Sequence, residues 1–412
     1  MHRPGLACRR PHRRCDRAAR RPPRRDRGRS ADSPDRRPRA HRPRPSWKGG
    51  RTVNRSTSRP EPIDFGHRQA RLRVGGLFAA RVSLRSLAVA LALTAVALGA
   101  AVLSLGFGDY PLTPLQVVRA LAGQGDDFHR LIVAEWRLPM AIGAILFGAL
   151  LGIGGAIFQS LTRNPLGSPD VIGFDAGAYT GVVLTTVLIG SHHHGSVATA
   201  AIAGGLLTAG VVQLLSSSRR GAHGFRLIVV GIAVSAMLQS ITSYLITRAD
   251  IDDAMSVGFW AAGSLNRVGW DALVPSLIGG ALVLACVSVL APALRQLELG
   301  DDAATAQGVD TARARPVLLI VGVAATALVT AAAGPIAFVA LAAPQLARRL
   351  TRTPGVTVAS AAFLGAALVS LAHTASLAVA QAYRPVPVGL ITVCVGGLYL
   401  IQLLIRETRR SI

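Results

Sequence analysis

The sequence predicts an all-α, polytopic membrane protein with ten transmembrane helices, and three observations lead to this fold class. Half of the 412 residues are hydrophobic and only 16% are charged, whereas roughly a quarter of a soluble domain is charged. Long uncharged stretches follow one another from residue 86 onward. The basic residues behind the net charge of +24 gather in the first 85 residues. These features argue against a soluble enzyme and against a disulfide-stapled scaffold.

Residues 1–85 form a separate region by composition. They hold 26 of the 45 Lys and Arg residues but six of the 21 acidic ones, a balance of +20, while residues 86–412 have a balance of +4. Residues 1–60 contain almost no large apolar side chain, so they cannot bury enough surface to offset their chain entropy. We predict a disordered, Arg/Pro-rich cytoplasmic tail over 1–85. A signal peptide is excluded because the first long apolar stretch begins only after residue 85.

The first part of this tail resembles DNA upstream of a gene that has been translated because the start codon was assigned too early. The chain has 44 Arg and one Lys, which indicates a GC-rich genome whose upstream DNA would translate into such a sequence. Codons for residues 48–51 could form a purine-rich ribosome site, and Val53 follows at a suitable spacing. We expect the true start near Val53. There are two alternatives: the tail could be a translated, solvated segment, or it could bind anionic lipid or nucleic acid through its arginines. Of these partners, nucleic acid is not expected.

The body, residues 86–412, divides into spans of about 20 mainly apolar residues, the length that crosses a bilayer. Uncharged stretch 176–218 is broken by a polar segment at 191–195 and holds two spans. Stretch 316–347 is broken at Gly334–Pro335, since proline cannot continue the helix that it follows, and also holds two. The remaining six stretches hold one span each: 86–108, 138–162, 227–247, 272–294, 353–383 and 385–405.

Arginine distribution sets the expected orientation. With the N-terminus in the cytoplasm, ten spans place 13 arginines in cytoplasmic loops and six on the opposite side. We therefore expect a multi-pass protein of the bacterial cytoplasmic membrane with both termini in the cytoplasm. Small residues such as Gly148 and Gly152 recur at the spacing that allows helices to pack closely in lipid.

The spans contain few groups that could do chemistry. Apart from His373 and Asp175 at a span edge, no ionisable side chain lies well inside a span, whereas gradient-driven carriers usually place such groups at the midplane. No G-x-x-x-x-G-K-[ST] phosphate loop is present, so the energy for transport would come from another subunit. Neither the four cysteines nor His192–His194 has metal-ligand partners in sequence. We expect no catalytic residue, no cofactor and no resident metal.

Four stretches together resemble the permease subunits of bacterial ABC importers for ferric siderophores and vitamin B12. They are Arg137-Leu-Pro with 155–173, Trp260–Leu265, 297–309, and 334–348 followed by Pro387-Val-Gly389. The resemblance covers about 84–406 and implies ten helices for each subunit. Segments 108–112 and 243–253 look most like one subunit of the catecholate-siderophore importers.

One motif, residues 296–312, joins two cytoplasmic span ends. Its acidic residues come early and Gly308 follows as a stop, which predicts a short helix with carboxylates at its positive end. The resemblance implies that this helix docks in a groove of the ATPase and transmits its closure. It assigns the coupling role to Glu298, Gly300, Asp301, Asp302 and Gly308. An ordinary solvated loop helix is the alternative.

The remaining motifs are less specific. Arg163-Asn164-Pro165 fits a cytoplasmic turn on propensity alone. Candidates for lining the transport pathway are Gln159, Trp260, Ser264 and Asn266, although Gln159 could instead bond a neighbouring helix and Trp260 could be an interfacial anchor. By resemblance Arg137 is a docking residue for the binding protein, or else a snorkelling residue at a span end. Met140 stands where the family often has a second Arg, and Arg384 is a further docking candidate.

The sequence thus indicates a permease subunit, not an enzyme, of an ATP-driven importer that moves ferric siderophore across the cytoplasmic membrane. The expected partners are an ATP-binding-cassette ATPase, a substrate-binding lipoprotein and a second permease subunit, either an identical copy or, more in keeping with the resemblance, a different chain. The alternatives are a cobalamin or haem permease of the same kind and, from a different class, a gradient-driven carrier.

Overall fold

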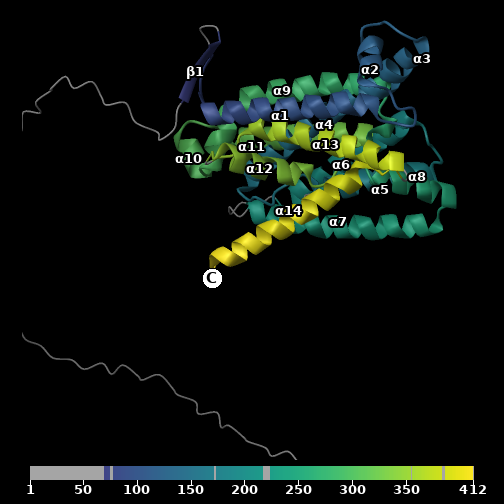
Figure 1. Cartoon of the computed structure of the whole chain (residues 1–412). Helices are drawn as coiled ribbons and strands as arrows, with labels where there is room; N and C mark the ends of the chain where they lie inside the picture. The colour runs from purple at the N-terminus through teal and green to yellow at the C-terminus, as the bar shows by residue number, and fades with distance from the viewer. Residues whose placement is uncertain are drawn as a thin grey trace, which may run out of the picture. The chain divides into compact units, whose positions relative to one another are not determined.

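The computed structural model describes residues 69–74, 78–170, 173–216, 223–353, 355–382 and 386–411. Most of these residues lie in α-helices that run side by side (Figure 1). Each of the ten predicted spans holds a helix, so the predicted fold class is confirmed. These helices are α1 (Leu84–Gly106), α4 (Leu138–Thr162), α5 (Phe174–Val183, continued by a π-helical turn to Leu188), α6 (His194–Ser216), α7 (His223–Arg248), α9 (Trp270–Glu298), α11 (Thr311–Ala333), α12 (Val339–Thr351), α13 (Val358–Ala382) and α14 (Val388–Ser411).

Short elements cap the two ends of this bundle. Helices α2 (Pro114–Leu121) and α3 (Asp127–Arg130) follow α1, and α3 runs through a π-helical segment, Leu131–Arg137, into α4. Helix α8 (Ile251–Ala261) and the 3₁₀ turn Leu265–Arg267 connect α7 to α9. Helix α10 (Asp301–Ala306) follows α9 and lies at the end of the bundle opposite α2 and α3 (Figure 1). We call these two ends the α10 end and the α2 end.

Helix α4 is the centre of the bundle. In its most apolar window 78% of the residues are buried, compared with 11% for α1 and 17% for α7, so α4 is surrounded by protein and the other two lie at the periphery. Gly148 and Gly152 of α4 lie against the backbone of Gly365 and Ala361 in α13, where a Cβ atom would overlap the facing carbonyl oxygens. The predicted close packing through small residues is therefore confirmed, and it joins α4 to α13.

Both predicted breaks between spans are present. The apolar helix that starts at Phe174 ends at Leu188, and α6 begins at His194. Helix α11 ends at Ala333 because Gly334 adopts φ 76°, and α12 begins after Phe338, which has φ 68°. A non-glycine residue in this left-handed region is uncommon, so the surrounding contacts hold the connection at Phe338 in place.

Part of the predicted disordered tail has regular structure. Strands β1 (Gln69–Val74) and β2 (Phe78–Ser83) pair antiparallel, with Gln69 opposite Ser83. Residues 69–74 and 78–83 therefore depart from the prediction of disorder up to residue 85, because a locally alternating apolar pattern is hidden in the average composition of the tail. Residues 84 and 85 begin α1, and residues 1–68, which include the expected start at Val53, lie outside the described residues.

Candidate coupling and transport sites

Helix α10 is a separate short helix held against the bundle at one end. It lies between Gly300 and Gly308, which have φ values of 116° and 87°. Asp301 and Asp302 occupy its first turn, so the short helix predicted within 296–312 is confirmed. Ala304 is fully buried, whereas Asp302 is exposed. One face of α10 is therefore fixed to the protein and the other is open to a partner.

Glu298, the last residue of α9, binds two other segments. Its Oε1 accepts a hydrogen bond from the hydroxyl of Ser160 (2.6 Å) and one from the backbone amide of Val356 (3.2 Å). Ser160 lies in the last turn of α4, and Val356 lies in the connection from α12 to α13. Glu298 thus points into the bundle and links the segment that leads into α10 to α4 and to the connection from α12 to α13.

Asp301 makes the second attachment. One carboxylate oxygen lies 3.0 Å from Arg163 and the other lies 2.8 Å from Arg315, which also donates to the carbonyl oxygen of Leu161 (2.7 Å). Arg315 lies in the first turns of α11, and Arg163 ends α4 with φ 51°. The predicted turn and the predicted coupling segment are therefore joined by the Arg163–Asp301 ion pair, and the Arg315–Asp301 pair ties the segment to α11.

The Arg163-Asn164-Pro165 turn has the predicted geometry. Asn164 Oδ1 accepts a hydrogen bond from the amide of Leu166 (2.9 Å), the local bond that makes asparagine favourable in turns. Gln345 of α12 donates to the carbonyl oxygen of Pro165 (3.4 Å), and the same Nε2 donates to Gln159 Oε1 (2.6 Å). The turn is thereby connected to α12 as well as to α10.

Gln159 bonds to a neighbouring helix, as its alternative interpretation stated. Its Nε2 donates to the carbonyl oxygen of Leu341 in α12 (3.0 Å). It borders a groove of about 410 Å³ at the α10 end, together with Arg163 and Glu298. This places Gln159 with the coupling residues and away from the other pathway candidates.

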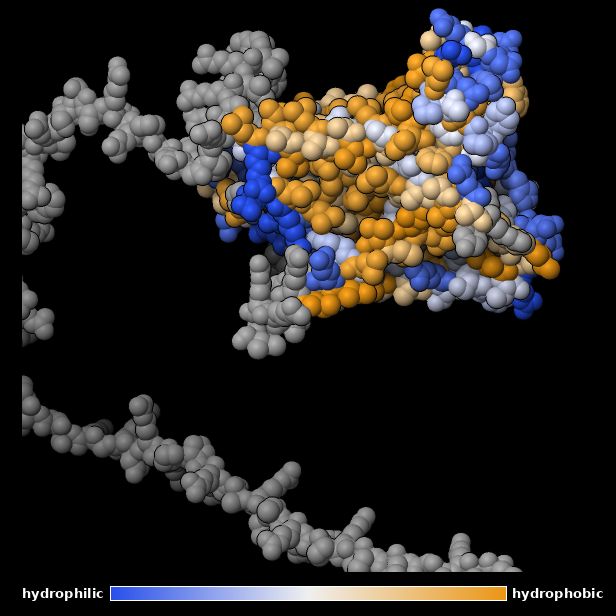
Figure 2. Space-filling view, viewed as in Figure 1, coloured by the Kyte–Doolittle hydropathy of each residue, from blue (hydrophilic) through white to orange (hydrophobic). Residues whose placement is uncertain are grey.

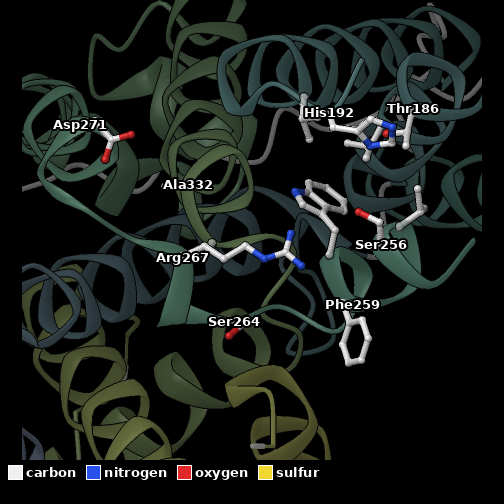
Figure 3. A pocket seen from close by; sticks show the side chains of 13 residues that line it. Thr186, His192, Ser256, Phe259, Ser264, Arg267, Asp271 and Ala332 are labelled. Atoms are coloured by element: carbon white, nitrogen blue, oxygen red, sulfur yellow. The ribbon is translucent and has the colours of Figure 1, made fainter. Parts of the chain in front are cut away.

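Trp260 and Ser264 line a cavity at the α2 end. Its volume is about 330 Å³, and the Arg267 side chain extends toward the wall that carries Ser256 and His192 (Figure 3). The indole ring of Trp260 is stacked on Tyr179, with ring centroids 6.3 Å apart, and this contact restricts its orientation. At the rim, His192 Nε2 lies 3.4 Å from a carboxylate oxygen of Asp253 in α8.

Asn266, the fourth pathway candidate, lines a different cavity of about 800 Å³, which Arg137 and His373 also border. The sequence-predicted pathway residues are thus distributed over three places instead of one wall. Met140, at the position where a second docking Arg was considered, also faces this larger cavity.

Arg137 is tied to the protein backbone. Its guanidinium donates to the carbonyl oxygens of Leu105 (2.8 Å) and Tyr110 (2.6 Å). These bonds hold the end of α1 and the connection from α1 to α2 against the start of α4. Arg137 therefore has a positioning role, which its place in the sequence did not reveal. The other predicted docking residue, Arg384, lies outside the described residues.

Three glycine-containing motifs meet at the α2 end. A Cβ atom on Gly263 would overlap the carbonyl oxygen of Pro335, and one on Gly334 would overlap that of Trp260. The amide of Gly389 donates to the carbonyl oxygen of Gly263 (3.0 Å). The motifs around 260, 334 and 389 therefore form one backbone junction, and this close approach explains why glycine occurs in each.

Two features escaped the sequence analysis. Gln239, Ser240, Ser243 and Thr247 form an exposed polar stripe along α7. The hydroxyls of Ser240 and Thr247 donate to carbonyl oxygens of their own helix, but the amide of Gln239 suits water or another subunit better than lipid. Their helical spacing within an apolar span was the available signal. In addition, Asp170 lies beside Asp175 and the backbone of Phe338, while Asp175 also approaches Thr330. Asp170 and the first turn of α5 are thus held against α11 and the connection from α11 to α12.

The helical architecture agrees with the proteins to which this chain is similar. Residues 88–406 match the model of the FecCD transport family. The chain belongs to the FecCD transport family. The chain is similar to the ferric enterobactin transport system permease protein FepG of Escherichia coli (strain K12), with 43% identity over 330 residues that cover 80% of this chain and 99% of FepG. The iron(3+)-hydroxamate import system permease protein FhuG of Bacillus subtilis (strain 168) is 34% identical, over 74% of this chain and 92% of FhuG.

A solved structure of a metal-chelate type ABC transporter in an inward-facing conformation matches this FecCD chain with a TM-score of 0.66 and 26% identity. The match covers 78% of this chain and 99% of the solved one. The arrangement of helices is therefore that of an ABC transporter permease, and the chain is a transport subunit.

Proposed function

We propose that this FecCD chain is the membrane-spanning permease subunit of an ATP-driven importer that moves a ferric siderophore into the cytoplasm. The observation that carries the proposal is α10, which is anchored through its own Asp301 and through Glu298 just before it, while Asp302 leaves the other face exposed. Such a helix can transmit force, because its anchors reach α4, α11 and the connection from α12 to α13.

The cargo we propose is a ferric catecholate. The support is the 43% identity with a ferric enterobactin permease along nearly its full length, compared with 34% for the hydroxamate permease. The relatives named above are proteins for iron chelates, which favours this cargo over cobalamin or haem. The anchored α10 favours an ATP-driven permease over a gradient-driven carrier.

The proposal implies three partners. An ATP-binding-cassette ATPase docks at the α10 end, which places that end and both termini in the cytoplasm. A substrate-binding lipoprotein delivers the chelate at the α2 end. A second permease subunit packs beside α7, where the stripe formed by Gln239, Ser240, Ser243 and Thr247 would face the shared pathway. FepD of Escherichia coli, a ferric enterobactin permease protein that is 36% identical over 61% of this chain, suggests a different chain as that second subunit.

Uptake in a deletion strain tests the proposal. Cells lacking this gene should lose uptake of ⁵⁵Fe-labelled triscatecholate and keep uptake of ferric hydroxamate and cobalamin, and a plasmid copy should restore it. In proteoliposomes that contain all partners, uptake should require ATP and should persist with an ionophore present. Uptake by this chain alone, driven by an ion gradient, would contradict the proposal.

A further inference from the structure

A groove lined almost entirely by apolar side chains lies between α12, α13 and α14. Its volume is about 240 Å³, and its walls include Phe338 and Leu346 of the α12 side, Leu371 and Ala375 of α13, and Val395 and Tyr399 of α14. Helix α14 diverges from α13 in this region, and the surface seen in the same view is largely hydrophobic (Figures 1 and 2). Leu371 and Val395 are 48% and 53% exposed, so the groove opens to the surroundings of the subunit.

Basic side chains lie at one end of the groove. The guanidinium of Arg349 lies over the Tyr399 ring, 5.5 Å from its centroid, and Arg349 is exposed. Arg352 follows it at the end of α12 and is also exposed. Arg85 of α1 donates to the carbonyl oxygen of Leu350 (2.8 Å), which brings a third exposed arginine to this end. A hydrophilic band borders the apolar surface at this end of the bundle (Figure 2).

No carboxylate offsets this charge from the helices that carry it. The sequences of α1, α12 and α13 contain no Asp or Glu, and that of α14 contains one, Glu407, together with Arg406, Arg409 and Arg410. The arginines also stand at the α10 end, which the proposed topology places in the cytoplasm. From Phe338 to Arg349 the distance along α12 is about 16 Å, comparable with most of one acyl chain.

We propose that this groove binds an anionic phospholipid of the cytoplasmic leaflet, with an acyl chain along α12 and α14 and its phosphate at Arg85, Arg349 and Arg352. The apolar walls of the groove suit an acyl chain. The positive charge of the arginine cluster is opposite to that of the phosphate, and the cluster lies at the end of the bundle where the headgroups of the cytoplasmic leaflet would be. Arginine suits the phosphate because its planar fork can donate two hydrogen bonds. This inference concerns lipid binding and does not depend on which chelate the transporter carries.

Native mass spectrometry of the purified transporter, with its partner subunits, tests the proposal. The probes are phosphatidylglycerol and phosphatidylcholine with identical acyl chains. We expect phosphatidylglycerol to bind more tightly, and Arg349→Gln with Arg352→Gln to weaken it about fivefold for each arginine. Arg313→Gln is the matched control, because it removes an exposed arginine at the same end, on α11, away from the groove. Equal binding by the double variant and the wild type would overturn the proposal.

Two further variants separate lipid from other occupants. Ala375 is exposed and lines the groove, so Ala375→Trp should fill it and reduce phosphatidylglycerol binding without disturbing the core. In a variant whose four native cysteines are replaced by serine, because Cys394 beside the groove is itself exposed, a cysteine at the same position (Ala375→Cys) should react with a lipid-soluble maleimide in the assembled transporter. Cross-linking of that cysteine to the second permease subunit instead would show that protein covers the groove, and the proposal would be wrong.

Discussion

At the scale of single residues, the side chains at the α10 end differ in the direction they face. Glu298 and Asp301 were both assigned to the ATPase-coupling segment, and each makes its hydrogen bonds or ion pairs to other parts of this chain. Exposed Leu299 (68%) and Asp302 remain available to a partner. The inward residues therefore hold the coupling segment, and the outward residues are the better candidates for docking.

Glu298→Ala should uncouple the segment from α4. It removes two hydrogen bonds to a charged group, each of which contributes about 1.5–3 kcal/mol. We expect slower iron uptake with the protein still in the membrane, as measured by ⁵⁵Fe uptake and immunoblotting. Glu298→Gln should retain part of the uptake, because its amide oxygen still accepts from Ser160. Wild-type uptake by the alanine variant would show that the Glu298 contacts are dispensable.

Arg137 can be tested for two roles with two substitutions. Arg137→Lys keeps the charge but loses the fork that reaches both Leu105 and Tyr110, so thermal stability should fall while affinity for the binding protein is kept. Arg137→Glu should lower both, with subunit assembly unchanged. Affinity should be measured at low salt, where screening is weakest. Unchanged affinity in Arg137→Glu would leave Arg137 with the positioning role alone.

At the scale of elements, the contact between α4 and α13 depends on glycine. Gly152→Leu should destabilise the protein by about 1–3 kcal/mol or more, because the added side chain meets the backbone of Ala361. Gly99→Leu in α1 is the control, since nothing lies within 4 Å of a Cβ built there. Melting of the purified protein should separate the two variants. Equal melting temperatures would contradict the packing argument.

The exposed face of α10 should be needed for coupling but not for folding. Asp302→Arg reverses a charge on that face without changing a special backbone conformation, so we expect normal protein levels, lost transport and weaker association with the ATPase. Gly300→Arg should have the same effect with some additional strain, because Gly300 has φ 116°. Co-purification of the ATPase is the measurement. Full transport by Asp302→Arg would exclude coupling through this face.

At the scale of the whole molecule, the transport unit is the helical body. FepG aligns over 99% of its own length with only 80% of this chain, and the family model begins at residue 88. Deletion of residues 1–52 should therefore leave uptake intact. N-terminal sequencing of the native protein should also find a start near Val53. Loss of uptake in a normally expressed truncation would show that the tail is required.

The fold was predictable from sequence where the signal is local. Span length follows from the thickness of the bilayer, and the breaks at 191–195 and at Gly334–Pro335 follow from polar residues, glycine and proline. The short helix after Gly300 was predicted from its acidic first turn and the following glycine. The paired strands at 69–74 and 78–83 were missed, because average composition concealed a brief alternating pattern.

By itself, then, the sequence indicated the ten apolar spans, the two breaks between them and, by resemblance, the permease family. Only the tertiary structure decided which residues work together. Glu298 and Ser160 are 138 positions apart, and Gln159 and Gln345 are 186 apart, so no local pattern could pair them. In the structure Gln159 lies beside the coupling residues, Asn266 and Trp260 line different cavities, and Arg137 donates to backbone carbonyl oxygens. The physical reason is that hydropathy and propensity act along the chain, whereas hydrogen bonds and cavities form between helices that only packing brings together.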